Sequence, residues 1–248
     1  KRQGFAVGVT FALRELRRHP GRWIRERLTK LSAYMAFFSV NANLFVRTMA
    51  LMFTFAFVTA QGARLGPAIL AANAVLMNFQ NLPSLGLDGI AHAAEAMVGK
   101  AVGKKDNRAV QRTVALTLRW SLYFAAGFTA LYVVAGPFIV RLLTDLPDVR
   151  ETAMVYLPWL IASPLISVWC FLYDGVYVGM TRARAMRNIM VVSTFGVFLP
   201  LWFVSQPLGN HGLWFALMGF MASRGIGMHL GYRKALRVAH GPEVSERS

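Results

Sequence analysis

Six long apolar runs, separated by short polar gaps, dominate the sequence. They extend over residues 33–60, 67–98, 113–140, 152–180, 185–204 and 208–231. Because about 20 helical residues cross a hydrocarbon layer of about 30 Å, each run is long enough to form a transmembrane helix. The pattern therefore predicts an all-α membrane protein, with a six-transmembrane-helix bundle over residues 33–236, a leading segment 1–32 and a tail 237–248.

Lys and Arg residues are concentrated in alternate gaps between the runs. Nine lie before the first run, five between the second and third, three between the fourth and fifth, and four after the sixth. The other gaps hold three cations: Arg64, Arg141 and Arg150. Since short loops rich in Lys and Arg stay on the cytoplasmic side, we expect a multi-pass protein of the cell inner (plasma) membrane with both ends cytoplasmic. The loops near Gly66, Pro147 and Gly209 are then expected to face outward.

Composition supports the membrane class. The chain is 56% hydrophobic and 15% charged, against about 45–50% and about 25% in soluble domains. The net charge of +16 could suggest nucleic-acid binding, but the cations are spread over one side of six spans, so we expect contact with anionic lipid head groups and no nucleic acid. Cys170 is the sole cysteine of the sequence. An intrachain disulfide is therefore impossible, and a packed thiol is expected.

The residues before the first run have a pattern of their own. Residues 5–13 are apolar but too short to span a membrane, and they are interpreted as the end of a preceding helix. Residues 14–30 combine arginines with apolar residues at near-helical spacing, which is typical of a segment lying in the head-group layer. We expect this segment to link two membrane lobes on the cytoplasmic side.

Proline and glycine interrupt most of the apolar runs. Mid-run prolines are Pro83, Pro137, Pro158, Pro164 and Pro200. A proline frees a backbone carbonyl, so each predicts a kink whose freed carbonyl finds a partner on a neighbouring helix or in a cavity. Glycines at four-residue spacing predict close helix approach, and the pairs are Gly99 with Gly103, Gly175 with Gly179, and Gly227 with Gly231.

Three segments carry a resemblance to a known family. Residues 86–106 (GLDGIAHAAEAMVGKAVGKKD) resemble the second-helix signature of multidrug and toxic compound extrusion (MATE) transporters. Residues 43–48 (NLFVRT) with 61–66 (QGARLG), and residues 175–182 (GVYVGMTR), are similar to further motifs of that family in the same order. The combination with Asp88, His92 and Glu95 is most similar to the DinF-like branch. The resemblance covers residues 33–236, as the carboxy-terminal lobe of a twelve-helix transporter.

The resemblance implies a secondary active antiporter. Such transporters export organic cations and other xenobiotics in exchange for H⁺ or Na⁺, with two six-helix lobes rocking around a central cavity. The implied partners are an amino-terminal lobe, membrane lipids and small-molecule substrates. A transporter of this kind is not an enzyme, and the resemblance implies no cofactor beyond the coupling ion. In the DinF-like branch the principal protonatable aspartates belong to the amino-terminal lobe.

The resemblance also places one acid of this chain in a family site. Several members bind a cation between a carboxylate of the seventh helix and an aspartate of the tenth. The tenth-helix position matches Asp174, whereas the seventh helix here offers Asn41, Asn43 and Arg47 and no acid. A complete sodium site of the family type is therefore not expected in this lobe.

Four ionisable residues inside the runs are candidates for coupling on physical grounds alone. An ionised Asp174 in hydrocarbon costs about 2.5–3.5 kcal/mol even on the lenient insertion scale, so it is expected to face a cavity or a partner. A buried carboxylate also binds a proton more readily than an exposed one. The alternative for Asp174 is neutralisation by Arg182 or Arg184, one or two helical turns away. Arg47, deep in the first run, is expected to pair with an acid, and its candidates are Asp88, Glu95 and Asp174.

The second run supplies a cluster of polar residues. Asp88, His92 and Glu95 are four and three residues apart and share one helical face, as candidates for cation or substrate binding. Pairing with Arg47 or Arg119 is the alternative. His92 and Glu95 have the spacing of some metal sites, but no further His or Cys ligand accompanies them, so no metal is expected. A polar cavity could be lined by Asn41, Asn43, Asn73, Asn78, Gln80, Tyr123 and Tyr177.

Three other classes remain as alternatives. A lipid-linked precursor flippase of the same superfamily would share kinked spans, but it would be expected to hold a pyrophosphate with many cations, and three arginines lie within these spans. A membrane enzyme would need a nucleophile with a base, or a ligand cluster, and no motif of that kind is present. A non-transporting membrane half-domain is the third alternative.

Overall fold

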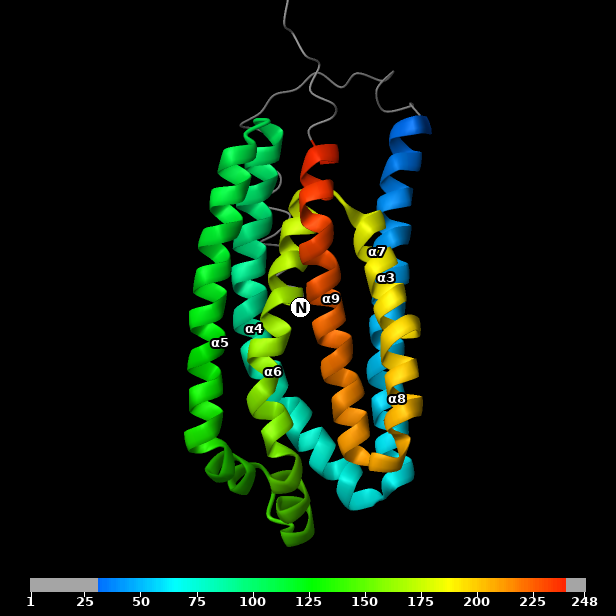
Figure 1. Ribbon diagram of the computed structural model, residues 1–248, viewed down its shortest axis with the longest axis vertical. Coiled ribbons are helices and arrows are strands. Elements are labelled where there is room, and N and C mark those ends of the chain that lie inside the picture. Colours follow the sequence, from blue (N-terminus) through cyan, green and yellow to red (C-terminus); the bar gives the residue numbers. More distant parts are fainter. Residues whose placement is uncertain (1–30, 240–248) are drawn as a thin grey trace, which may run out of the picture. The chain divides into compact units, whose positions relative to one another are not determined.

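The computed structural model describes residues 31–239, all but the turns between elements being helical (Figure 1). The elements are α3 (Leu31–Leu65), α4 (Pro67–Gly103), α5 (Asn107–Leu143), α6 (Pro147–Gly179), α7 (Ala183–Val191), a π-helical segment η1 (Val192–Phe198), α8 (Leu199–Ser205), a 3₁₀ turn η2 (Gln206–Leu208) and α9 (Asn210–Ala239). The predicted features in residues 1–30, and the end of the tail, lie outside the described residues. The chain divides after Ser39 into two compact units, and the arrangement below is that of residues 40–239.

The six predicted spans correspond to six helical segments, because α7, η1 and α8 follow one another without a break. The predicted fold class is therefore confirmed. Four of these segments are both long and apolar enough to cross a membrane, namely Phe38–Leu65, Asn107–Leu143, Pro147–Gly179 and Ala183–Leu208. The α4 and α9 helices have 37 and 30 residues, so both are long enough to cross a membrane, but they are not among the four that are also apolar enough.

The helices extend beyond the apolar runs at the basic gaps. The α4 helix continues five residues past the predicted end to Gly103, and α5 begins at Asn107, six residues before the predicted start. The short turn between them holds Lys104 and Lys105, and Asp106 caps α5 by accepting a hydrogen bond of 2.9 Å from the Ala109 amide. Lys and Arg have high helix propensity, so a helix can continue beyond the last residue of an apolar run.

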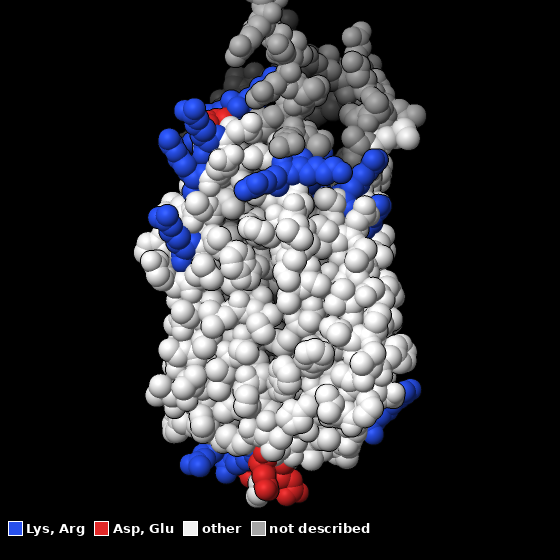
Figure 2. Space-filling view, viewed as in Figure 1, with Lys and Arg blue, Asp and Glu red and all other residues white. Residues whose placement is uncertain are grey.

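The described helices run alternately up and down, so the basic turns meet at one end. In Figure 1 the α4–α5 and α6–α7 turns and the end of α9 lie at the top, while the α3–α4, α5–α6 and α8–α9 turns lie at the bottom. Figure 2 shows Lys and Arg gathered near the top and a white band without charged residues across the middle of this face. The charge asymmetry of the sequence is thus an asymmetry between two ends of the folded lobe.

The α6 helix lies at the centre of the lobe and packs against α4, α5 and α9. The α3 helix instead packs on the segment from η1 to α8. The Phe57 ring lies edge-on to Phe198 and to Trp202, with centroids 5.5 and 6.2 Å apart, and the Thr54 and Thr194 hydroxyls are 3.4 Å apart. Cys170 is buried in the central core as a free thiol, as predicted.

The carbonyls that two of the prolines free are satisfied by side chains. Pro83 cannot donate to the carbonyl of Phe79 one turn earlier, and the buried Tyr132 hydroxyl of α5 donates to that oxygen at 2.6 Å. Pro164 likewise frees the carbonyl of Leu160, which accepts from the Ser163 hydroxyl at 2.8 Å. The Tyr132 contact confirms the expectation of a partner on a neighbouring helix, whereas the partner of the Leu160 carbonyl lies within α6 itself.

Candidate functional site

The site is built where α4 and α6 approach most closely. A β-carbon at position 175 would overlap the carbonyl oxygen of Ala91, and one at position 179 would lie 2.6 Å from the carbonyl of Glu95. Only glycine fits such contacts, so the predicted Gly175–Gly179 pair brings the two backbones together. Asp174 precedes the first of these glycines, and its position relative to α4 is therefore fixed by backbone packing.

Asp174 binds two arginines from two other helices. Its Oδ2 atom accepts a hydrogen bond from an amino group of Arg47 on α3, and a second one, 2.7 Å long, from Nη2 of Arg224 on α9. One carboxylate oxygen thus joins α3, α6 and α9. The predicted pairing of Arg47 with an acid is confirmed, and its partner is Asp174. Neutralisation of Asp174 by Arg182 or Arg184 is not what the structure shows.

Arg224 is the most deeply buried member of this triad, at 3% exposure. Its guanidinium lies 5.3 Å from the centre of the Phe220 ring, a cation–π arrangement, and Nη1 lies 3.6 Å from the Met221 sulfur. A buried charge of this kind needs a counter-charge. Asp174 is the counter-charge, and the triad of two arginines and one aspartate therefore carries a net positive charge.

The hydrogen-bonding capacity of the triad is incompletely used. The second carboxylate oxygen of Asp174, Oδ1, is buried and has no hydrogen-bond partner within residues 31–239, and the same holds for the Nε atoms of Arg47 and Arg224. Unpaired polar groups at such depth cost free energy, about 1–3 kcal/mol each by mutational data. They mark the triad as a place where a further polar group can bind or where partners can exchange.

The acids of α4 lie outside the triad. Asp88 is exposed on the described lobe, yet it lies within electrostatic range of Arg47, Asp174 and Arg224. His92 and Glu95 face one another across one turn at 3.4 Å, and both side chains are exposed. Arg119 on α5 is exposed as well. None of the described residues belongs to a cluster of three or more His, Cys, Asp or Glu residues that could hold a metal ion.

The remaining candidates fall into two groups. Asn41 and Asn78 are exposed, and Asn43 is buried one turn before Arg47 on α3. Tyr177 is fully buried, and its hydroxyl donates to the Met228 carbonyl at 2.8 Å, which ties α6 to α9. This contact gives Tyr177 a clear part in helix packing.

Asn73 lies in a buried amide network at the end opposite the basic turns. It exchanges two hydrogen bonds with Asn210, of 2.8 and 2.9 Å, and its Oδ1 accepts from the Trp214 indole at 2.9 Å. The network links the start of α4 to the start of α9. It is separate from the triad, so the structure does not bring Asn73 together with Asp174.

Sequence reasoning missed Arg224 as a site residue. The available signal was a single arginine in the middle of the last apolar run, which is as costly in a membrane as Arg47. No spacing rule connects it to Asp174, because the two residues are 50 positions apart and belong to different helices.

Comparison with known proteins decides the family. The sequence model of the MatE family matches residues 43–204, which include the two triad members on α3 and α6. The chain belongs to the MatE family. The MatE resemblance of the three sequence motifs is thereby confirmed, and members of this family are transporters.

Two relatives place this MatE chain more closely. It is 39% identical over 200 residues to DNA damage-inducible protein F of Escherichia coli strain K12, covering 80% of this chain and 43% of the relative. It is 26% identical over 196 residues to Protein DETOXIFICATION 42 of Arabidopsis thaliana, covering 79% of this chain and 38% of the relative. The DinF-like resemblance is confirmed, and the chain spans less than half the length of these two relatives.

A solved structure supports the fold. The crystal structure of the Vibrio cholerae MATE transporter VcmN in the bent form superposes with a TM-score of 0.84 at 19% sequence identity. The match covers 95% of this chain and 54% of that transporter. The six-helix MatE fold described above is therefore one lobe of a larger arrangement in that structure.

Proposed function

We propose that this chain forms one half of a secondary active antiporter that exports organic cations or other xenobiotics in exchange for H⁺ or Na⁺. The observation that carries the proposal is the Arg47–Asp174–Arg224 triad, an ion network joining three helices inside an apolar lobe. Ionisable groups at such depth are costly and mark transport pathways in membrane proteins. Family membership supports a transport function. The identities of the coupling ion and of the cargo are proposed here.

The two acids near the triad are assigned different roles. Asp174 already has two arginine partners on its Oδ2 atom. A cation that binds at the remaining Oδ1 atom would lie close to both guanidinium groups and be repelled by them. Asp88 is exposed, near the triad and hydrogen-bonded to neither arginine, so Asp88 is the acid that binds and releases the coupling ion, and Asp174 holds the helices.

Binding of the coupling ion to Asp88 changes the electrostatic attraction that Arg47 and Arg224 experience. An ionised Asp88 attracts Arg47 and Arg224 in competition with Asp174, whereas a neutralised Asp88 does not. Because the arginines lie on α3 and α9, a change in their partner shifts these helices relative to α6. This shift is the step by which the transporter opens to one side of the membrane at a time.

The test is transport by the full-length protein in liposomes, with export of a fluorescent organic cation driven by an imposed proton or sodium gradient. We expect Asp88→Asn to abolish gradient-driven export while gradient-free exchange of the substrate continues, and Asp88→Glu to retain part of the coupling. Glu151→Gln, an exposed acid at the opposite end, is the matched control and leaves export unchanged. Full gradient-driven export by Asp88→Asn would remove Asp88 from the coupling role.

One observation favours a second candidate function. The net positive charge of the triad suits an anionic cargo, such as a carboxylate or the pyrophosphate of a lipid-linked precursor, better than a cationic one. The same liposomes decide between them. Export of a fluorescent organic anion, with the organic cation not carried, would replace the cation exporter by this alternative.

A further inference from the structure

A polar pocket of about 500 Å³ lies between the start of α5 and the end of α9. It is lined by Asn107, Gln111, Tyr232, Arg233 and Leu236. The Tyr232 hydroxyl and the Asn107 Oδ1 atom are buried and have no hydrogen-bond partner among the described residues. A guanidinium, an amide and an unpaired hydroxyl at one pocket are the groups that bind a phosphate.

The surroundings of this pocket attract anions. The turn before α5 carries Lys104 and Lys105, the first turn of α5 carries Arg108, and Lys234 follows on α9. The acid of this turn, Asp106, uses its carboxylate to cap α5. Clusters of Lys and Arg at the cytoplasmic end of membrane helices bind anionic lipid head groups.

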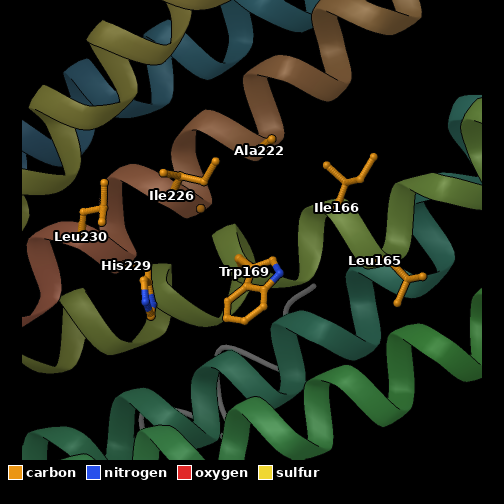
Figure 3. A pocket seen from close by; sticks show the side chains of 8 residues that line it. Leu165, Ile166, Trp169, Ala222, Ile226, His229 and Leu230 are labelled. Carbon is orange, nitrogen blue, oxygen red and sulfur yellow. The ribbon is translucent and has the colours of Figure 1, made fainter.

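A second pocket, which is apolar, lies further along α9. It has a volume of about 450 Å³, and Figure 3 shows side chains of α6 and α9 around it. Its lining residues are Leu165, Ile166, Trp169, Ala222, Gly225, Ile226, His229 and Leu230. The pocket is suited to hydrocarbon, because its side chains are almost all apolar and His229 already has a partner in the Tyr173 hydroxyl, at 2.7 Å.

The two pockets lie on one face of α9, because their lining residues Ile226, His229, Arg233 and Leu236 recur at intervals of three and four residues. Tyr173 packs against His229 of the apolar pocket, with centroids 5.6 Å apart, and against Tyr232 of the polar pocket at 5.9 Å. From Ala222 to Arg233 the α9 axis rises roughly 16 Å, at 1.5 Å per residue. That length matches one leaflet, which is half of a hydrocarbon core of about 30 Å.

We propose that these two pockets, side by side along α9, together bind one anionic phospholipid. The phosphate lies at Arg233 and Tyr232, and one acyl chain lies against Trp169 and Ile226. The bound lipid fills the space between α9 and its neighbours at the basic end, on the side of the membrane where anionic head groups meet the Lys and Arg residues. This site is distinct from the triad and does not depend on which cargo or ion is transported.

The test uses the full-length protein, freed of lipid in an uncharged detergent, with bound lipid counted by native mass spectrometry. Phosphatidylglycerol and phosphatidylcholine with identical acyl chains are the probes. We expect phosphatidylglycerol to bind about tenfold more tightly, because both lipids offer the same phosphate but the choline cation of phosphatidylcholine is repelled by Arg233 and the surrounding Lys and Arg residues. Arg233→Gln should remove most of this preference, and Lys234→Gln, the neighbouring exposed cation outside the pocket, should retain it.

A second variant tests the acyl chain. Ile226→Trp, at a position 58% exposed, fills the apolar pocket and should weaken binding of both lipids, whereas Leu142→Trp, at an exposed apolar position of α5, should not. Equal loss in Arg233→Gln and Lys234→Gln would reduce the site to general surface charge and overturn the proposal. Displacement of the lipid by millimolar inorganic phosphate, with Ile226→Trp binding normally, would show a free-phosphate site and also overturn it.

Discussion

Arg224 of α9 donates a hydrogen bond of 2.7 Å to Asp174 of α6, and the same carboxylate oxygen accepts from Arg47 of α3. The two ion pairs share one carboxylate oxygen, so the energy of each depends on the other. Removing either arginine leaves a neutral pair, but removing the carboxylate leaves two cations facing each other inside an apolar lobe.

This arrangement predicts an order of stability among variants. Asp174→Asn should lower the free energy of unfolding by about 3–5 kcal/mol, because Arg47 and Arg224 lose their counter-charge. Arg224→Met should cost less, about 1–3 kcal/mol, since Asp174 keeps Arg47. The measurement is thermal unfolding in detergent, followed by reaction of a thiol dye with Cys170, which is buried in the folded protein. Glu151→Gln, an exposed acid at the opposite end, is the control and should leave the midpoint unchanged. Equal midpoints for Asp174→Asn and Arg224→Met would contradict the shared-carboxylate arrangement.

The hydrogen bond from Tyr132 to the Phe79 carbonyl predicts a dependence on Pro83. Tyr132→Phe should lower stability by about 1–3 kcal/mol, because the carbonyl that Pro83 frees is left unpaired in the core. In a Pro83→Ala background the backbone amide of residue 83 can donate to that carbonyl, so the same change should cost less. A double-mutant cycle by the Cys170 unfolding assay measures the difference. Equal costs in both backgrounds would show that the hydroxyl does not compensate for the proline.

The close approach of α4 and α6 predicts that Gly175 cannot carry a side chain. Gly175→Ala should destabilise the lobe by about 1–3 kcal/mol, as overpacking does, because its β-carbon meets the backbone of Ala91. Gly127→Ala is a matched control on α5, where the described residues leave open space, and it should be neutral or stabilising by up to about 1 kcal/mol. The same thiol assay compares the two variants, and equal midpoints would refute the backbone contact.

The charge asymmetry predicts which side of the membrane each end faces. With Cys170 replaced by Ala, a cysteine at position 104 should react with an impermeant maleimide only after the cells are permeabilised. A cysteine at position 145, an exposed site at the opposite end, should react in intact cells. The expected orientation follows from the excess of Lys and Arg in alternate gaps. Reaction of both positions from the same side would contradict the six-span topology.

Much of the fold could be predicted from the apolar runs, whereas the ends of its helices could not. The runs ending at residue 98 and beginning at residue 113 gave the correct helices, but α4 and α5 continue through basic residues that hydropathy treats as loop. The π-helical segment was also not predicted. A change from α to π hydrogen bonding leaves the composition of an apolar run unaltered, so hydropathy contains no signal for it.

The site could be predicted in part. The cost of Arg47 in hydrocarbon required an acidic partner, and three acids were available, but choosing Asp174 needs the tertiary arrangement that brings Arg47 of α3 to Asp174 of α6. The positions of Asn73 and Tyr177 in structural networks depend on α9, which hydrophobic periodicity does not place. The pairing of Arg224 with Asp174 could not be predicted either, because contacts between segments that are distant in the sequence depend on tertiary packing.

The π-helical segment has one further consequence, for the angular register of its span. Met190, Thr194, Phe198 and Trp202 are all buried, at 3% exposure or less, and follow one another at intervals of four residues. In an α-helix of 3.6 residues per turn each such interval drifts by about 40°, so three intervals would carry Trp202 about 120° away from Met190. The wider turns of η1 absorb this drift and keep one stripe facing inward along the whole span. Deleting a single residue from η1 would restore α-helical winding and leave Trp202 within about 20° of Met190, so the contact with Phe57 would be kept.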